Sequence, residues 1–337
     1  VDGASLFLLA DDIKKYYLGQ DIAELKFTFR DYSMALNDYK TKKQYENHKN
    51  YWMKKIDDFS PAPALPLAID PSLLKNPQFN RKEGMISKER WEKIKEAAKL
   101  HNVTAAGLLC TIYAKILSNW SGQDKLAINT TVFKRHDFHE DVNKLIGDFT
   151  CIILLDVEIN YKESFWEQVM SVQNVLGEAL THSDFSGVEL TREITKRQGM
   201  TGKASMPYVF TCALFEDTGS AWDVLGEMKY AQSRTPQVYL DNQIIQTGGE
   251  LSVVWDYPQG LFEQSLIDEM FENYMDILDR IADGVVQDIT LSIDDFRLIT
   301  EYNETQEDIQ ISTLQKMFVD SAYKYPDLPA VSCKGKS

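Results

Sequence analysis

Two reactive side chains, the hydroxyl of Thr211 and the carboxyl of Asp241, each close an apolar run rich in β-branched residues. Thr211 ends MPYVFT, and Asp241 follows in TPQVYLDNQ. Such runs are typical of buried strands, so we expect each group near the end of a strand. A carboxylate and a hydroxyl brought together there could transfer protons in a partly dry pocket. On the pattern alone, an ordinary strand threonine and a turn aspartate are the simpler interpretation.

A second group with possible chemistry is HDFH, where His136 and His139 have a His-x-x-His spacing beside Asp137 and Glu140. A zinc site needs further ligands on a rigid helix or loop, and nothing in the sequence supplies them. We therefore expect a solvated loop and no metal. There is also no Ser-His-Asp order and no glycine loop typical of phosphate binding.

The elements that must position Thr211 and Asp241 follow from hydrophobic periodicity. Predicted helices cover residues 6–18, 30–56, 163–181, 187–197 and 262–282, with one around Trp91 and one capped by Thr104 that buries a face from Ala105 to Trp120. Predicted strands cover 125–133 and 149–157, and a third carries Thr211 near its end. A further pair of strands turns at Gly248–Gly249 and ends near Tyr257.

The proline-rich stretch SPAPALPLAIDP, residues 60–71, cannot continue a helix. We expect it to be an extended segment that crosses between two lobes. Helices and strands mixed in this order predict an α/β fold, of the α+β layered kind.

Composition limits the class of protein. The 337 residues are 44% hydrophobic and 26% charged, as in a soluble globular protein with a large core. A net charge of −15 argues against a nucleic-acid partner. No run approaches the ~20 apolar residues of a membrane helix, so no membrane partner is expected. The start, VDGASLFLL, lacks the basic region of a signal peptide.

The four cysteines, Cys110, Cys151, Cys212 and Cys333, form no C-x-x-C pair. Cys110 and Cys151 lie in apolar patterns, so they are expected to be small buried side chains rather than disulfide partners. A cytoplasmic, reducing environment fits this pattern.

Motifs spaced along most of the chain form an ordered series. They are VDGAS, FRDYSMAL, YWMKKIDDFSPAPALPL, LSNWSG, KLAINTTVFKR, LIGDFTCIILLDV, SGVELTREI, MPYVFTCALF, SRTPQVYLDNQ, GGELSVVWDY and FEQSLIDEMFENYMDIL. In this order, over residues 1 to about 290, they resemble the heterocyclization domains of nonribosomal peptide synthetases. VDGAS is similar to the end of that family's Asp-x4-Asp-Gly-x-Ser motif. Ordinary condensation domains share the overall layout but lack the GDFT and TPQVxLD wording.

The resemblance implies a chloramphenicol-acetyltransferase-like lobe of a V-shaped two-lobe domain whose N-terminal lobe is truncated. Both ends of the chain look cut. The implied divisions are the end of the N-terminal lobe (1–60), an inter-lobe crossing segment (61–86), the C-terminal lobe (87–290), a linker (291–310) and the beginning of an adenylation domain (311–337). The last piece has none of that family's glycine-rich nucleotide motif, so it is not expected to bind ATP alone.

The resemblance also implies a reaction. A carrier-bound acyl or peptidyl thioester is condensed with a Cys, Ser or Thr thioester, and cyclodehydration then gives a thiazoline or oxazoline. The catalytic pair of the family carries over to Thr211 and Asp241. A carboxyl that alternates between acid and base suits the dehydration, and a hydroxyl can orient it or stabilise the departing oxygen.

Other motif residues are expected to position or brace this site. Asp2, Gly3 and Ser5 would shape a turn and a helix start, which favours a structural role for Asp2. Asp148 and Thr150 of GDFT are expected to line or brace the tunnel. Gln237 could hydrogen-bond the nascent ring or the pantetheine arm, with a loop-capping role left open. Two positions depart from the family: Cys212 stands where Ser is expected, and Arg234 where Gln is expected.

Two other functions stay open, an ordinary amide-forming condensation domain and a non-catalytic docking module. The expected partners are upstream and downstream peptidyl carrier domains and the adjoining adenylation domain. No cofactor is expected to bind directly, because the substrates ride on the 4′-phosphopantetheine of the carriers. The product would belong to antibiotic or siderophore biosynthesis, and the fragment alone is expected to be inactive. The acceptor, the donor acyl group and the oligomeric state do not follow from the sequence.

Overall fold

The computed structural model describes residues 2–198, 206–214, 226, 232, 234–235, 237–285 and 313–329. The chain divides into two compact units, Val1–Ile289 and Thr290–Ser337. The described part of the second unit contains one helix, α11 (Leu314–Lys324), whose N-terminus is capped by the Thr313 side chain. The resemblance predicts the first helix of an adenylation domain in this stretch, and the predicted strand after it lies outside the described residues.

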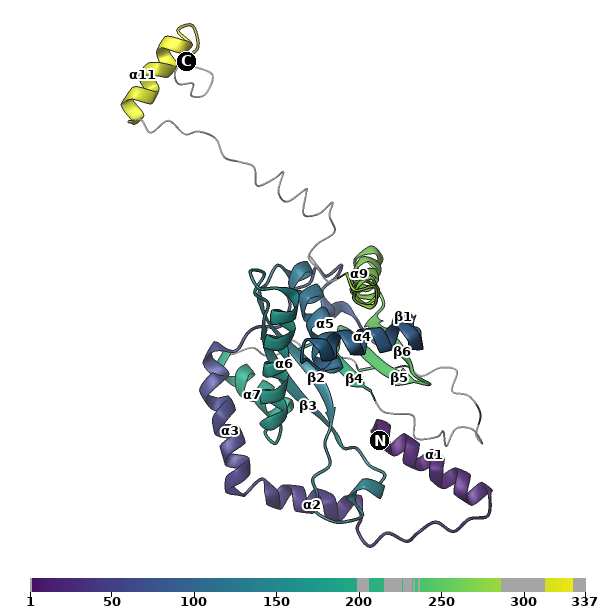
Figure 1. The fold of residues 1–337 in the computed structure, drawn as a ribbon. Coiled ribbons are helices and arrows are strands. Elements are labelled where there is room, and N and C mark those ends of the chain that lie inside the picture. The colour runs from purple at the N-terminus through teal and green to yellow at the C-terminus, as the bar shows by residue number, and fades with distance from the viewer. Residues whose placement is uncertain are drawn as a thin grey trace. The chain divides into compact units, whose positions relative to one another are not determined.

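A six-stranded mixed sheet forms the centre of the first unit (Figure 1). Its order is β1-β6-β5-β4-β2-β3. The strands are β1 (Phe79–Ile86), β2 (Lys125–Phe133), β3 (Thr150–Glu158), β4 (Tyr208–Ala213), β5 (Leu240–Thr247) and β6 (Glu250–Pro258). β4 runs parallel to both β2 and β5, whereas the other neighbouring pairs are antiparallel. The layered mixture of helices and strands expected from the sequence is therefore confirmed.

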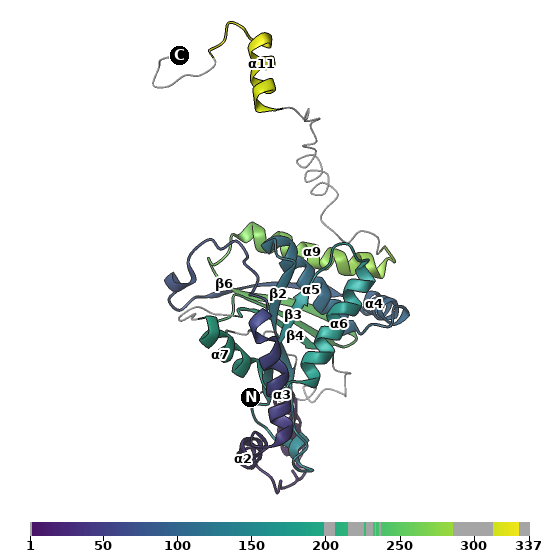
Figure 2. The ribbon, with the colours of Figure 1, turned by 90° about the vertical axis from the view of Figure 1, so that its left-hand side faces the viewer.

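One face of this sheet is covered by the helices α4 (Lys88–Leu100), α5 (Ala105–Ser121) and α9 (Gln264–Ala282). Trp255 on β6 lies at the centre of this layer, with ring centroids 6.0 Å from Tyr113 of α5 and 6.0 Å from Tyr274 of α9. From α4, Trp91 donates a hydrogen bond to Gln246 of β5 at 2.9 Å. Figures 1 and 2 show the three helices gathered along the same side of the strands. The main hydrophobic core lies between these layers.

The helix ends follow the signals in the sequence. Thr104 caps α5 by accepting a hydrogen bond from the backbone of Gly107, and Gly122 ends the helix in the left-handed region with φ 67°. A capping box of Ser164 and Glu167 starts α6 (Phe165–Thr181). α5 is buried all round over most of its length, not on one face as predicted, because α6 and α9 also pack against it.

The hairpin between β5 and β6 has the turn that its sequence predicts. Thr247 and Glu250 are paired, and Gly248 and Gly249 between them have φ 59° and 85°. A two-residue turn with both central residues at positive φ matches the twist of an antiparallel pair, and glycine adopts it without a steric cost.

The helix predicted over residues 30–56 is two helices, α2 (Phe29–Tyr39) and α3 (Lys43–Lys55). The prediction of one helix is wrong because the two halves pack on different cores. α2 buries Tyr32 in a small cluster with Val142, Leu145 and Phe149, whereas α3 buries Tyr45 and Trp52 in the main core. At the break the Thr41 hydroxyl donates to the Asp38 carbonyl at 2.7 Å, in place of a helical continuation.

The expected crossing segment, 61–86, contains more structure than its sequence suggested. Its last part is the edge strand β1, which pairs with β6 over its whole length. The sequence FNRKEGMI lacks the apolar alternation of a strand, and the strand is recognised only by its backbone pairing with β6. Within the described ranges, no single helix has the length and apolar composition to cross a membrane, and α4 with α5 meets those criteria only as a pair bent by 95°.

Candidate active site

Thr211 and Asp241 lie on the sheet face opposite to α4 and α9. Directly paired residues point to the same side of a sheet, and so do residues two apart along a strand. The pairing of β4 with β5 therefore places Thr211, Asp241 and Gln243 on one face, and Phe210 and Asn242 on the other. The structure brings together the two side chains that the sequence singled out, on adjacent parallel strands.

The position of Asp241 within its strand differs from the prediction. Asp241 is the second residue of β5, so it begins the strand instead of ending it. The run TPQVY that precedes it resembles a strand in composition. Residue 239 instead forms a bend leading into β5, and the Tyr239 amide donates to the Pro207 carbonyl. The local pattern could not distinguish this approach from a paired strand, because pairing depends on partners far along the chain.

The Thr211 hydroxyl is oriented by a second threonine. Its Oγ1 donates a hydrogen bond of 3.0 Å to Oγ1 of Thr131, the residue paired with it on β2. Since a hydroxyl carries one hydrogen, this bond leaves the lone pairs of Thr211 to face the site. Thr211 is partly exposed at this position, so a substrate group could reach it.

The Asp241 carboxyl belongs to a hydrogen-bonded group that spans three strands. Nε2 of Gln243 donates to Oδ2 of Asp241 at 2.9 Å and to Oδ2 of Asp256 at 3.1 Å. Asp256 in turn receives two hydrogen bonds from Arg81, from Nε at 2.8 Å and from Nη2 at 2.6 Å. The Asp256 side chain is fully buried and that of Arg81 is 15% exposed. The group is a built feature of the sheet face and not a chance surface contact.

The sequence reasoning did not identify Arg81, Gln243, Asp256 or Thr131. For Gln243 and Thr131 a signal was present, because each is a polar residue at an alternate position of a strand whose other face is buried. Arg81 gave no such signal, because β1 lacks apolar alternation. Asn129 is another polar residue on this face. It is paired with Val209, which is in turn paired with Asp241, and its Oδ1 is buried without a hydrogen-bond partner among the described residues. Alternation could be used only after the strand boundaries were known.

Asp2 is the N-cap residue of α1 (Gly3–Tyr17) and is not part of the paired strands that carry Thr211 and Asp241. Its Oδ1 accepts a hydrogen bond of 2.9 Å from the Ser5 amide and lies 3.2 Å from Nη2 of Arg135. The Ser5 hydroxyl binds both backbone groups of Gly147 at 3.0 Å. A Cβ on Gly3 would approach the Phe133 ring to 3.7 Å. The three motif residues thus fasten the helix start to the segment before β3.

Asp148, Thr150 and Gln237 are exposed. Oδ1 of Asp148 accepts a hydrogen bond of 3.1 Å from the Thr150 amide, which closes a local turn at the start of β3. Thr150 is paired with Phe133 and shares the face of Thr211. Gln237 lies in a turn that precedes β5. Whether these residues position substrate stays a prediction.

The two departures from the family pattern have different surroundings. Cys212 follows Thr211 on β4, so its side chain points to the opposite face, toward the helices, and burial raises the pKa of its thiol to about 12. A neutral thiol facing the core cannot contact a substrate held against Thr211. Arg234 is exposed and donates to Gln232 at 3.0 Å.

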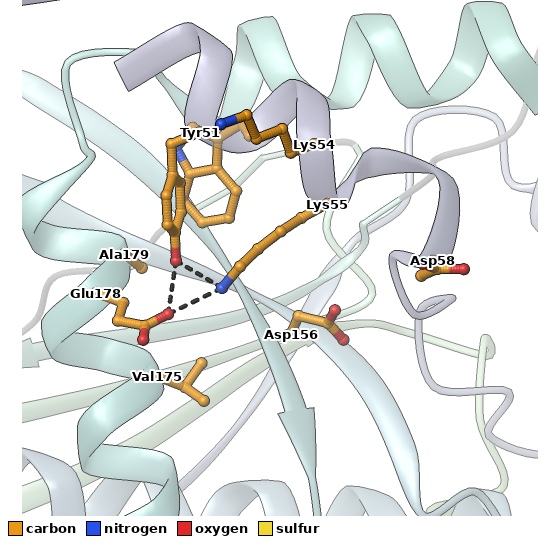
Figure 3. A pocket seen from close by; sticks show the side chains of 9 residues that line it. Tyr51, Lys54, Lys55, Asp58, Asp156, Val175, Glu178 and Ala179 are labelled. Atoms are coloured by element: carbon orange, nitrogen blue, oxygen red, sulfur yellow. Dashed lines mark hydrogen bonds and ion pairs between the residues drawn. The ribbon is translucent and has the colours of Figure 1, made fainter. Parts of the chain in front are cut away.

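A pocket of about 310 Å³ opens elsewhere on the first unit, between α3, α6 and β3. Figure 3 shows Tyr51, Lys55 and Glu178 joined at its edge, with Asp156 across from them. The Tyr51 hydroxyl donates to Glu178 at 2.6 Å, and Lys55 lies 2.9 Å from the same carboxylate. Hydrogen bonds from Lys55 and Tyr51 lower the pKa of Glu178. These groups satisfy one another, and Thr211 and Asp241 do not line the pocket.

The HDFH segment does not gather ligands. His136 lies 3.7 Å from Asp184, whereas His139 stacks on the Phe27 ring at 4.8 Å. Burial, followed by the nearby Lys134, lowers the pKa of His136. The described residues contain no group of three or more His, Cys, Asp or Glu side chains arranged to hold a metal ion.

The chain is similar to known proteins in both its sequence and its fold. The family model described as "Condensation domain" matches residues 1–306. The chain is 36% identical to bacitracin synthase 1 of Bacillus licheniformis over 337 residues, covering 98% of this chain and 6% of that protein. It is 32% identical to pyochelin synthetase PchF of Pseudomonas aeruginosa over 290 residues, covering 84% and 16%. The chain thus spans a small part of these relatives.

A solved structure extends the similarity to the fold. The EpoB cyclization-docking bidomain of a nonribosomal peptide synthetase from Sorangium cellulosum matches with a TM-score of 0.76 and 29% identity. The match covers 84% of this chain and 58% of that one.

Proposed function

Because the chain belongs to the condensation-domain family of nonribosomal peptide synthetases, we propose that it is of the heterocyclization type. It joins a carrier-bound acyl or peptidyl thioester to a Cys, Ser or Thr thioester, and then closes that residue's side chain into a thiazoline or oxazoline. The observation that carries this proposal is the placement of Thr211 and Asp241 on one face of adjacent strands, with Asp241 held by Gln243. The similarity to EpoB, a protein described as having a cyclization domain, supports it.

The first step needs positioning more than proton transfer. The acceptor amine attacks the donor thioester carbon, the thiol of the upstream carrier leaves, and an amide forms. Holding the two thioesters at contact distance supplies most of the rate of such a step. The 4′-phosphopantetheine arms of the partner carrier domains bring these substrates, and the adjoining adenylation domain selects the acceptor.

The second step gives Asp241 its role. The acceptor's thiol or hydroxyl adds to the amide carbon, and a tetrahedral adduct with a hydroxyl group forms. Asp241 takes the proton from the ring nitrogen, the C=N bond forms, and the same carboxyl returns a proton to the departing hydroxyl, which leaves as water. One group that first takes and then gives a proton ends the cycle unchanged.

Thr211 assists as an acceptor. Because its hydrogen is directed to Thr131, the Thr211 hydroxyl can accept a hydrogen bond from the ring N–H or from the hydroxyl group of the adduct. Asp241 meanwhile exchanges a proton with the other of these two groups. Donation to the departing oxygen requires the hydroxyl to rotate away from Thr131.

The test is the product of the full-length synthetase, with both carriers loaded. Mass analysis of the carrier-bound product should show the condensed species lighter by one water. An ordinary condensation domain would give the linear amide alone, and a docking module would give neither. Either of those outcomes with an active adenylation domain would contradict the proposal.

A further inference from the structure

The carboxylate network, defined as Asp241, Gln243, Asp256 and Arg81, contains an arrangement that costs stability by itself. Asp241 and Asp256 are directly paired across the antiparallel strands β5 and β6. Like charges in this position destabilise a sheet. Asp256 is moreover fully buried, where an ionised carboxylate needs a partner and hydrogen bonds. A neutral residue at either position would avoid this cost, so the two carboxylates are not explained by the stability of the sheet.

The other two members of the network compensate this arrangement. Arg81 of β1 is paired directly with Asp256 of β6 and donates to its carboxylate from two nitrogens. This two-nitrogen contact is the strong, geometrically fixed form of an ion pair. Gln243 stands two residues from Asp241 and donates from one nitrogen to both carboxylates. Gln243 therefore links the ion pair to Asp241 and directs its own carbonyl oxygen away from the carboxylates.

We propose that Arg81, Asp256 and Gln243 are positioning residues that orient the Asp241 carboxyl and set how readily it takes and returns a proton. The inference rests on the proposed function, since it assigns these three side chains a part in the ring-forming step. None of the three needs to touch the substrate.

Among the described residues of the neighbouring strands, the charged side chains on the face of Asp241 include Asp256, Arg81 and Glu83. β4 presents Val209 and Thr211, which carry no charge. β6 presents Asp256, and β1 presents Arg81 and the exposed Glu83. On the other side of the sheet, burial raises the pKa of the Tyr113 phenol of α5, and the nearby charge of Asp241 raises it further. Asp256 and Arg81 carry opposite charges, so removing one or the other should change how readily Asp241 takes up a proton, in opposite directions.

The experiment follows the pH dependence of ring formation in the full-length synthetase. The acid-side limb of this profile reports the ionised form of Asp241 that accepts the proton. Arg81→Gln leaves Asp256 without its guanidinium partner. The uncompensated negative charge beside Asp241 then favours the protonated form of Asp241, so the acid-side limb should move up by about one pH unit. Asp256→Asn leaves Arg81 positive, so the limb should move down by a similar amount. The double variant should return the limb close to its original position.

Controls separate charge from structure. Arg81→Lys keeps the charge and loses the fork, so its limb should stay in place. Arg90→Gln breaks a more exposed ion pair with Asp279, 2.7 Å long, between α4 and α9, and should leave the profile unchanged. Gln243→Met removes the link and should slow ring formation about 10-fold or more while linear amide still forms. Amide formation in the same reaction shows that each variant is folded.

Three outcomes are possible. Opposite shifts with recovery in the double variant support the inference. Ring formation in the unaltered enzyme, with a limb that none of these charge changes moves in its predicted direction, overturns the inference and leaves the proposed function intact. Linear amide alone from the unaltered enzyme overturns both. If Arg81→Gln fails to fold, the Asp256→Asn shift and the double variant still decide.

Discussion

Asp241 is paired with Val209, not with Thr211, across the parallel strands β4 and β5, and Thr211 is paired with Gln243. The two proposed catalytic side chains are therefore diagonal neighbours on one face, with Gln243 beside both of them. A reacting group must lie over the strands to reach the hydroxyl and the carboxyl together. This offset separates the two roles: Gln243 links Asp241 to Asp256 of β6, whereas Thr211 is hydrogen-bonded to Thr131 of β2.

Replacing Asp241 with Asn should abolish most ring formation and retain linear amide. The amide step depends on positioning, whereas dehydration loses a proton carrier worth about 10²–10⁴-fold. Mass analysis of the carrier-bound product measures both species. Asp276→Asn on α9, where the side chain is 64% exposed, is the matched control. Undiminished ring formation by the Asp241 variant would remove this residue from the mechanism.

Thr211→Ala should slow cyclization on the order of 10²-fold, the scale of one lost oriented hydrogen bond in a site. Thr211→Ser keeps the hydroxyl and its reach to Thr131, so it should retain more activity. Thr131→Val should give a smaller loss, because it frees the Thr211 hydroxyl without deleting it. Single-turnover rates of ring closure distinguish the three. Equal rates for the Ala and Ser variants would mean that the hydroxyl is not the operative feature.

Asp2→Ala should destabilise the first unit by about 3 kcal/mol, because it deletes a helix cap and leaves the buried Arg135 guanidinium without its carboxylate. The Asp2 side chain is fully buried and that of Arg135 is 11% exposed. Asp2→Asn keeps an oxygen for the Ser5 amide and should lose less. Urea unfolding measures the difference, and Asp21→Ala, an exposed change, should have little effect. A stable Asp2→Ala protein with no ring formation would instead assign Asp2 to catalysis.

Lys115 should make stability rise between about pH 8 and pH 10.4. Its side chain is 2% exposed and donates to Gln168 at 2.6 Å. Burial lowers its pKa to about 8 in the folded protein. The unfolded chain therefore binds this proton more tightly, and folding is penalised at neutral pH by up to about 3 kcal/mol.

Lys115→Met should accordingly raise stability at pH 7 and flatten this rise. Chemical denaturation at pH 7 and at pH 10 measures the change. Lys125→Met, at a position with 64% side-chain exposure, serves as the control. A rise that is the same in both variants would show that Lys115 is not its source.

Much of the fold could be predicted because its signals are local. Thr104 caps α5, Gly248 and Gly249 form the hairpin turn, and the inward residues of α9 repeat at helical spacing and are buried. Each signal depends on a few neighbouring residues and on backbone sterics that do not change with context. The motifs around Thr211 and Asp241 were informative for the same reason, because their wording is contiguous.

Only the tertiary structure decided what surrounds Asp241. The predicted turn at Gly248–Gly249 sets Asp241 opposite Asp256, but the sequence offered no basis for placing Arg81 of β1 in the same row. It also placed Asp241 at the wrong end of its strand and did not identify β1. The physical reason is that strand register is set by which side chains must be buried over the whole sheet. Contacts between distant segments carry that choice, and no local pattern contains it.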